Sequence, residues 1–497
     1  MVNDEASFRV MRHPAFLIAL VFVVSVKIFL FLNYAPYELA KNSPVLDYAS
    51  AILKDSRWLT DARELESPFP FLLWRPIGYP LAIAFSKIAA GDNWSYFIII
   101  IQNVLSVVSS VYAAILFMAC GMNRTFSVIS FLLLSFSVSL SNDLLLFSDS
   151  LASSVFIICI SVVCTRFVMG HALEFGVIIY TGFGLSLCFL LRDSYLFIGA
   201  FTAVAVFFLI AAGGATVPNA MKRAVLFVAP LVIITSLIMG WNYMRTGHPV
   251  ITTGGSTGYL LPVLKSAQQD LAVFGSDSLL DQVAREKVTD FDDADTYSIN
   301  YALFERYGFN AFEISEMMKE KYFHTIVNFP DAYFASLRVK LNFRKQAPLL
   351  GDPLAQIDDL DYWASLSGGE AFETDWRSEI QRFYETRDPR TLSGASALKL
   401  VPRLFFRLTS TTLYFVFLLL VPVVGLWGMR HEKGSTWRRV SMLFLALWVV
   451  YALVVLMYAQ FVMYARYLAP VSFIPILCSL TYLSIFFDKL RNREMGS

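Results

Sequence analysis

The chain has 497 residues, 57% of them hydrophobic and only 16% charged, with a net charge of +1 at neutral pH. A soluble protein of this length carries roughly 25% charged residues. The missing charge and the mean hydropathy of +0.58 exclude a soluble globular protein and indicate that a bilayer solvates most of the chain. The balanced net charge gives no electrostatic reason to expect a nucleic-acid partner.

Apolar runs of spanning length recur along the sequence. The first run is too long for a cleavable signal peptide and lacks a small-residue cleavage site, so we expect it to remain as the first span. The runs cover 14–34, 95–119, 126–142, 150–169, 173–191, 194–213, 224–242, 404–429, 440–461 and 468–487. They predict an all-α polytopic membrane protein with about ten transmembrane helices.

Basic residues in the short connections predict the orientation, because Lys and Arg concentrate on the cytoplasmic side. Arg9 and Arg12 precede the first run and place the N-terminus in the cytoplasm. With ten spans, the other basic positions fall on the same side: Arg124, Arg166, Lys222, Arg223, 430–439 and 489–493. The connections between the remaining span ends are therefore expected on the opposite face.

Residues 71–90 are apolar but are interrupted by Arg75, Lys87, two prolines and a glycine. The distribution of basic residues is consistent only if this segment does not cross the membrane. We predict a re-entrant or interfacial segment that returns to the outer face.

Two substantial pieces lie on the non-cytoplasmic side in this topology. The loop 35–94 belongs to an N-terminal membrane module, 1–242. A large, mainly helical loop domain, 243–403, separates that module from the C-terminal membrane helices of 404–497.

The large loop domain has two readable features. Within 300–344, apolar residues recur at helical spacing, for example Ile314, Met318 and Tyr322, which predicts amphipathic helices. Its start, 254–258, reads Gly-Gly-Ser-Thr-Gly and predicts a flexible turn. Because no strand precedes it and no Walker lysine follows, it is a weak indication of phosphate binding.

Polar side chains from several helix ends are expected to gather at the outer face. A charge in apolar surroundings costs on the order of 2.5–3.5 kcal/mol on insertion scales, so such groups face a cavity or one another. Arginine binds phosphate through its planar fork, and a carboxylate can remove a proton from a hydroxyl. Together they predict chemistry on a lipid-linked phosphate. The set contains Asp47, Tyr48, Arg75, Lys87, Asn142, Asp143, Asp149, Arg192, Asp193, Arg245, His248, Arg466 and Tyr467.

Each of these side chains also has a structural interpretation. Acidic residues at helix ends cap helices, basic residues near aromatic belts snorkel to the interface, and neighbouring charges pair. On this reading Asp47 is a helix N-cap or a solvated loop acid, and Asp143 and Asp149 cap a tight turn. The interfacial residues are Arg75, Arg466, Lys87 and Lys27 of the first span. Arg192 pairs with Asp193, and His248 is structural.

Two motifs of the first outer loop resemble a known superfamily. Residues 43–48 read Ser-Pro-Val-Leu-Asp-Tyr and residues 75–80 read Arg-Pro-Ile-Gly-Tyr-Pro. They are similar to the first outer loop of GT-C glycosyltransferases, particularly bacterial members related to protein O-mannosyltransferases and to the aminoarabinose and galacturonic-acid transferases of lipid A. The stretches 191–193, 241–247 and 464–470 also resemble that superfamily. The chain departs from it in having Asp47-Tyr48 where some members have paired acids, and Ile77 where a second proline is common.

The resemblance implies a GT-C-like fold and an inverting transferase at the periplasmic face of a bacterial inner membrane. The donor would be a polyprenyl-phosphate sugar, and the acceptor a glycolipid, another lipid, a polysaccharide or a protein. Asp47 would be the catalytic base, with Arg75, Arg192 and Arg466 on the carrier phosphate. The remaining substrate-site residues would be Tyr48, Tyr79, Lys87, Asp149 and Arg245.

Other readings stay open beside this one. No cofactor is indicated and no metal-ligand spacing is present, although scattered carboxylates could bind a divalent metal. An O-antigen-ligase-like enzyme would rely on Arg245 and His248 rather than on Asp47. A secondary transporter would place charges near the midplane and repeat its pattern in two halves.

Overall fold

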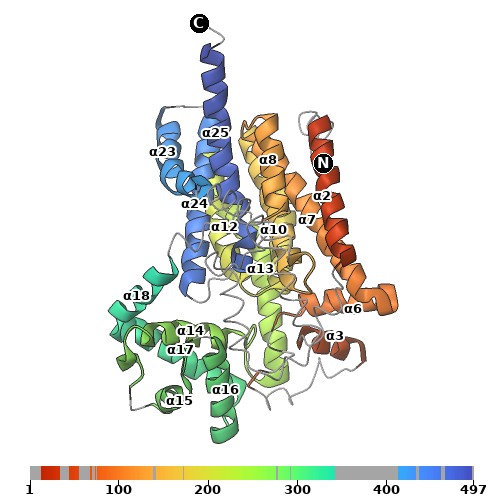
Figure 1. Cartoon of the computed structure of the whole chain (residues 1–497). Coiled ribbons are helices and arrows are strands. Elements are labelled where there is room, and N and C mark those ends of the chain that lie inside the picture. Colours follow the sequence, from red (N-terminus) through yellow and green to blue (C-terminus); the bar gives the residue numbers. More distant parts are fainter. Residues whose placement is uncertain are drawn as a thin grey trace, which may run out of the picture.

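The computed structural model describes residues 13–33, 44–54, 68–69, 73, 75–137, 142–171, 173–275, 278–291, 293–341, 412–431, 436–460 and 465–494. Within these ranges every regular element is a helix (Figure 1). Eight of the described helices are long and apolar enough to cross a membrane, and α8 (Arg124–Ser135) and α11 (Phe175–Leu191) are shorter apolar helices. The prediction of an all-α polytopic membrane protein is confirmed.

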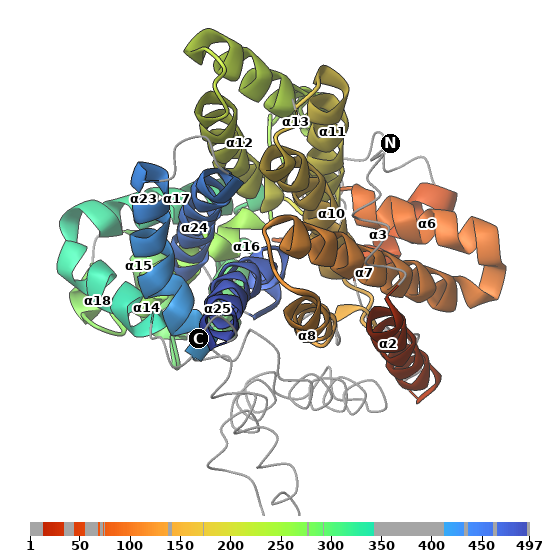
Figure 2. The same ribbon diagram turned by 90° about the horizontal axis from the view of Figure 1, so that it is seen from above.

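The bundle combines helices from both ends of the chain. Its centre is formed by α10 (Ser148–Met169) and by the span 467–488, whereas α2 (Pro14–Asn33) lies at the edge (Figure 2). In an apolar 18-residue window of each, 72%, 83% and 28% of the residues, respectively, are buried. The span 467–488 consists of most of the short η8 (Ala465–Val471) and most of α25 (Phe473–Glu494). The other bundle helices are α7 (Trp94–Ala119), α12 (Tyr195–Ala212), α13 (Val217–Thr246), Thr412–Arg430 with α23 (Val421–His431), and α24 (Thr436–Gln460).

Helix ends next to basic residues meet at one end of the bundle. The side chain of Asn123, before α8, donates to Asp488 near the end of α25 over 3.1 Å. Arg439, in the first turn of α24, donates to the carbonyl of Val168 at the end of α10 over 2.8 Å. The start of α2 and the C-terminus lie at this same end (Figure 1). The grouping agrees with the side predicted from the basic residues.

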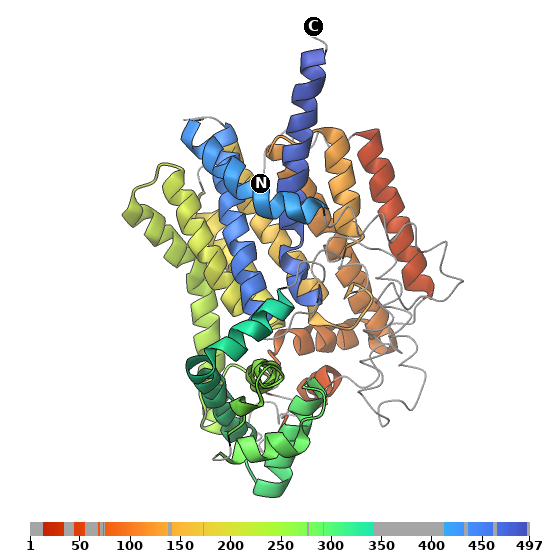
Figure 3. The same ribbon diagram turned by 60° about the vertical axis from the view of Figure 1, so that its left-hand side comes forward.

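The first outer loop contributes two helices at the opposite end, α3 (Pro44–Lys54) and α6 (Gly78–Ala90). With 13 residues, α6 is about 20 Å long, too short for a core of about 30 Å. It runs across the bundle direction (Figures 1 and 3). Its buried side carries Tyr79 and Ile83, while Phe85 and Ile88 are exposed. The length and direction of α6 agree with an interfacial segment; that residues 78–90 do not cross the membrane stays a prediction.

Residues 255–341 form a separate helical unit at the same end as α3 and α6 (Figure 3). Its helices are α14 (Gly255–Ala267), α15 (Leu279–Lys287), α16 (Asp293–Tyr307), α17 (Ala311–Asn328) and α18 (Pro330–Lys340). Ile314, Met318 and Tyr322 of α17 are buried in a core of its own, so the predicted amphipathic helices are confirmed.

Two sequence expectations need correction, and a third is described only in part. The Gly-Gly-Ser-Thr-Gly stretch is not a flexible turn, because α14 begins at Gly255. Within the run 126–142, α8 ends at Ser135 because the chain leaves that helix at Phe136, and residues 138–141 lie outside the described residues. In the run 404–429, residues 404–411 lie outside the described residues. The part that is described, Thr412–Arg430, is one of the eight helices long enough to cross, and it lies obliquely over the bundle (Figure 3).

Candidate functional site

Arg192 and Asp149 form a buried ion pair at the end of the bundle that carries α3 and α6. Arg192 ends α11 and Asp149 lies in the first turn of α10, where the helix dipole favours a carboxylate. Their side chains are 9% and 4% exposed. Arg192 therefore pairs with Asp149 and not with its neighbour Asp193, whose carboxylate accepts from the hydroxyl of Thr252 over 3.0 Å.

An aromatic surface covers the guanidinium of this pair. The Arg192 guanidinium carbon lies 4.3 Å from the ring centroid of Tyr467. Tyr467 stacks on Tyr458 of α24 with 5.2 Å between the ring centroids. The stack orients the planar guanidinium of Arg192. A guanidinium in this orientation can release its carboxylate partner and bind two oxygens of a phosphate instead.

A second buried ion pair joins the first span to the segment between α8 and α10. The ammonium of Lys27 lies 2.5 Å from one oxygen of Asp143, and the hydroxyl of Ser150 donates to the other over 2.5 Å. Lys27 is 4% exposed and Asp143 is fully buried, so Lys27 does not snorkel and Asp143 is not a surface cap. Sequence reasoning left Lys27 out of the site. Two features of the sequence could have indicated the pair. Lys27 lies within one apolar run, and Asp143 directly follows a different apolar run.

Tyr79 belongs to the hydrogen-bond network behind this pair. Its hydroxyl donates to the Gln102 side chain over 2.9 Å, and the Gln102 amide donates to the carbonyls of Asp143 and Leu145 over 3.2 and 2.9 Å. Tyr79 is 2% exposed. In this arrangement Tyr79 fixes the backbone of the 142–150 segment, which carries both acids.

The first outer loop is anchored beside Arg192. A side chain at Gly78 would meet the carbonyl oxygen of Leu190 at 2.5 Å, so only glycine allows α6 to approach the end of α11 this closely. Lys87 of α6 donates to Ser50 of α3 over 3.1 Å and lies 5.2 Å from the ring centroid of Trp94. These contacts connect α3, through α6, to the helix end that bears Arg192.

The structure places the remaining predicted residues as follows. Asp47 and Tyr48 lie on α3 and Arg466 lies on η8, but their side chains are outside the described residues. Arg75 is half-buried just before α6. Their proposed roles stay predictions.

Arg245 lies in the last turn of α13. Its guanidinium lies 4.2 Å from the ring centroid of Trp241 and donates to Asn242 over 2.7 Å, and Asn242 in turn donates to the carbonyl of Val250. Next to it, His248 stacks on Phe312 of α17 with ring centroids 4.1 Å apart. Both side chains hold the junction between α13 and the helical unit.

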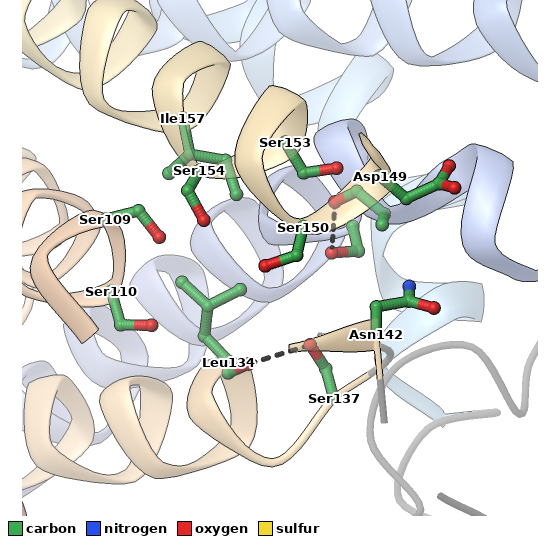
Figure 4. A pocket seen from close by; sticks show the side chains of 12 residues that line it. Ser109, Ser110, Leu134, Ser137, Asn142, Asp149, Ser150, Ser153, Ser154 and Ile157 are labelled. Atoms are coloured by element: carbon green, nitrogen blue, oxygen red, sulfur yellow. Dashed lines mark hydrogen bonds between the residues drawn. The ribbon is translucent and has the colours of Figure 1, made fainter. Parts of the chain in front are cut away.

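A small polar cavity, lined in part by Asp149, lies between α7, α8, α10 and η8 (Figure 4). Seven serines, Asn142 and Asp149 line it together with three apolar side chains, and the space open to the centre of a water molecule is about 20 Å³. Among the described residues no three His, Cys, Asp or Glu side chains lie close enough together to hold a metal ion. The possible divalent metal thus stays a prediction.

Comparisons of the chain with protein-family models, with curated proteins and with solved structures find no match.

Proposed function

We propose that the protein is a membrane glycosyltransferase that moves a sugar from a polyprenyl-phosphate carrier to an acceptor at the end of the bundle formed by α3 and α6. The observation that supports this most is the convergence at that end of a buried arginine, its carboxylate partner and the helix that bears Asp47. The first-loop resemblance to GT-C transferases points to the same chemistry.

In the proposed reaction Asp47 removes the proton from the acceptor hydroxyl as that oxygen attacks the sugar carbon. The bond between the sugar and the phosphate breaks, and the carrier phosphate leaves as an anion. Arg192 is the described group best suited to stabilise it, because its guanidinium is pre-oriented on Tyr467 and permanently charged. Arg75 and Arg466 are proposed as further phosphate contacts.

Two measurements test this function. Mass spectrometry of envelope glycolipids and glycoproteins from a deletion strain should show a missing sugar that the wild-type gene restores. With the donor and acceptor thus identified, purified Asp47→Asn should transfer about 10²–10⁴-fold more slowly, the usual contribution of a general base. Asp92→Asn is the matched control, because Asp92 is an exposed acid at the same end, between α6 and α7.

The outcomes separate the proposal from its rival. Wild-type transfer by Asp47→Asn would remove Asp47 as the base. Loss of transfer in His248→Ala with full activity in Asp47→Asn would instead favour the ligase-like enzyme. An unchanged envelope in the deletion strain contradicts the transferase itself.

A further inference from the structure

The polar cavity lined by Asp149 has a defined hydrogen-bonding character. Ser109 and Ser110 both donate to the carbonyl of Ser106, over 2.8 and 3.0 Å, and Ser137 donates to the carbonyl of Leu134 over 2.7 Å. A hydroxyl has one donor and two lone pairs, so these serines can only accept from an occupant of the cavity. The occupant must therefore donate hydrogen bonds.

The side chain of Asn142 requires that the same occupant also accept a hydrogen bond. Its side-chain amide nitrogen is buried and has no hydrogen-bond partner, and the residue is 5% exposed. Asn142 and Asp149 lie on one side of the cavity, with Ser109 and Ser110 opposite (Figure 4). Buried polar groups almost always have a partner, so this amide calls for an acceptor. An occupant that both donates and accepts satisfies both sides.

The charge around the cavity favours a neutral occupant. Asp143 is paired with Lys27 and Asp149 with Arg192, so the two acids are already balanced. A bare cation would add an uncompensated buried charge, and an anion would meet serine lone pairs and carboxylates. A cavity needs roughly 10–15 Å³ of space for a water centre to hold one water, and this one offers about 20 Å³.

We propose that this cavity is a binding site for a structural water molecule that accepts from Asn142, donates to the serine oxygens and hydrates the neighbourhood of Asp149. Its role rests on the proposed function. When Arg192 turns toward the carrier phosphate, Asp149 loses its counter-charge inside the bundle. The water and the amide of Asn142 then supply the donors that keep that carboxylate solvated.

Substitution of Asn142 tests the site without any activity assay. Asn142→Leu keeps the approximate size and removes the amide. If water satisfies the amide, its loss should lower the apparent Tm of the purified protein by a few degrees. If the cavity is dry, removing an unpartnered amide should raise the Tm, and that result would overturn the proposal.

Ser161→Ala is the matched control. Ser161 lies on the same helix, α10, and its buried hydroxyl also lacks a partner, but it does not line the cavity. Its replacement should leave the Tm unchanged or raise it. Because a misfit of leucine would also lower the Tm, a high-resolution structure of the wild type must show density for a water within hydrogen-bonding distance of Asn142. Density with short contacts that appears only in sodium salts would identify a cation and overturn the proposal.

A kinetic measurement tests the role of the water. In Asn142→Leu the KM for the phosphate-bearing donor should rise severalfold, because releasing Arg192 from Asp149 becomes less favourable. The KM in Ser161→Ala should stay at the wild-type value. An unchanged KM in Asn142→Leu contradicts the role in releasing Arg192. If the wild type transfers no sugar, the proposed function fails while the Tm and density measurements still decide the water site.

Discussion

The membrane bundle and the helical unit of 255–341 each contain a buried ion pair, but in different surroundings. In the unit, Lys321 of α17 lies 2.7 Å from Asp281 of α15, with side chains 9% and 7% exposed. In the bundle, the side chains of Arg192 and Asp149 are buried to a similar degree. Burial alone therefore does not distinguish the two pairs.

What differs is the space and the chain around each pair. Lys321 and Asp281 join two helices of the unit, and the ammonium lies 5.8 Å from the ring centroid of Phe274. Arg192 lies at a helix end, against Tyr467, beside a polar cavity and the anchored first loop. We infer that a buried ion pair indicates function only under two conditions. A ligand must be able to reach the pair, and a charged group of that ligand must be able to replace one of its two members.

The largest expected effect comes from breaking each pair. Asp281→Leu and Asp149→Leu should each lower the free energy of unfolding by about 3–5 kcal/mol, because each leaves a buried charge without its partner. The doubles Asp281→Leu/Lys321→Met and Asp149→Leu/Arg192→Met should recover most of that loss, as measured by thermal unfolding in detergent.

Transfer activity then separates the two pairs. The Asp281/Lys321 double should transfer at close to the wild-type rate, whereas the Asp149/Arg192 double should be inactive although it is folded. If the Asp149→Leu/Arg192→Met protein is folded and fully active, the Arg192–Asp149 pair has only a structural role, like the Lys321–Asp281 pair of the helical unit.

A smaller effect is expected where the two regions meet. The Tyr322 hydroxyl lies 3.3 Å from the Tyr333 hydroxyl and donates to Gln460, at the end of α24, over 3.3 Å. Tyr322→Phe should weaken the contact between the helical unit and the bundle by about 0.5–1.5 kcal/mol. The measurement is hydrogen exchange, which should become faster in α17 and α18. Burial raises the pKa of Tyr322 well above its usual value, so the effect should not vary between pH 6 and 9, roughly the range in which an ordinary tyrosine stays protonated. Tyr307→Phe, at an exposed tyrosine of α16, should change nothing.

The smallest effect is expected at the exposed pair of Glu286 and Arg306, whose side chains are 51% and 45% exposed. The hydrogen bond from Arg306 lowers the pKa of Glu286. The stabilisation is therefore present at neutral pH and is lost as the pH falls below the usual range of a carboxyl group. Since solvent screens the pair, Glu286→Gln should leave the Tm at neutral pH unchanged within error. A clear drop in Tm would show that exposed pairs in the unit matter more than the comparison implies.

Much of the fold follows from the sequence because membrane spans are encoded locally. A helix in lipid must satisfy its own backbone and present apolar side chains over a fixed length, so the runs are readable one at a time. An irregular segment was also readable before α7, since Arg75, Lys87 and two prolines do not suit a span. The sequence also singled out the partners of the buried pair Arg192 and Asp149, because ionisable groups near apolar runs are few. The serine cavity could not be predicted, since scattered serines give no signal until packing brings α7, α10 and the ends of α8 and η8 together.

The sequence by itself determined that this is a multi-pass helical membrane protein with its polar groups gathered toward one face. Only the tertiary structure decided which buried charged side chains form ion pairs with each other. Arg192 pairs with Asp149, 43 positions away, instead of the adjacent Asp193, and Lys27 pairs with Asp143, 116 positions away, instead of snorkelling. The physical reason is that hydrophobic periodicity is a property of neighbouring residues, whereas the partner of a buried charge depends on which helix ends the packing brings together.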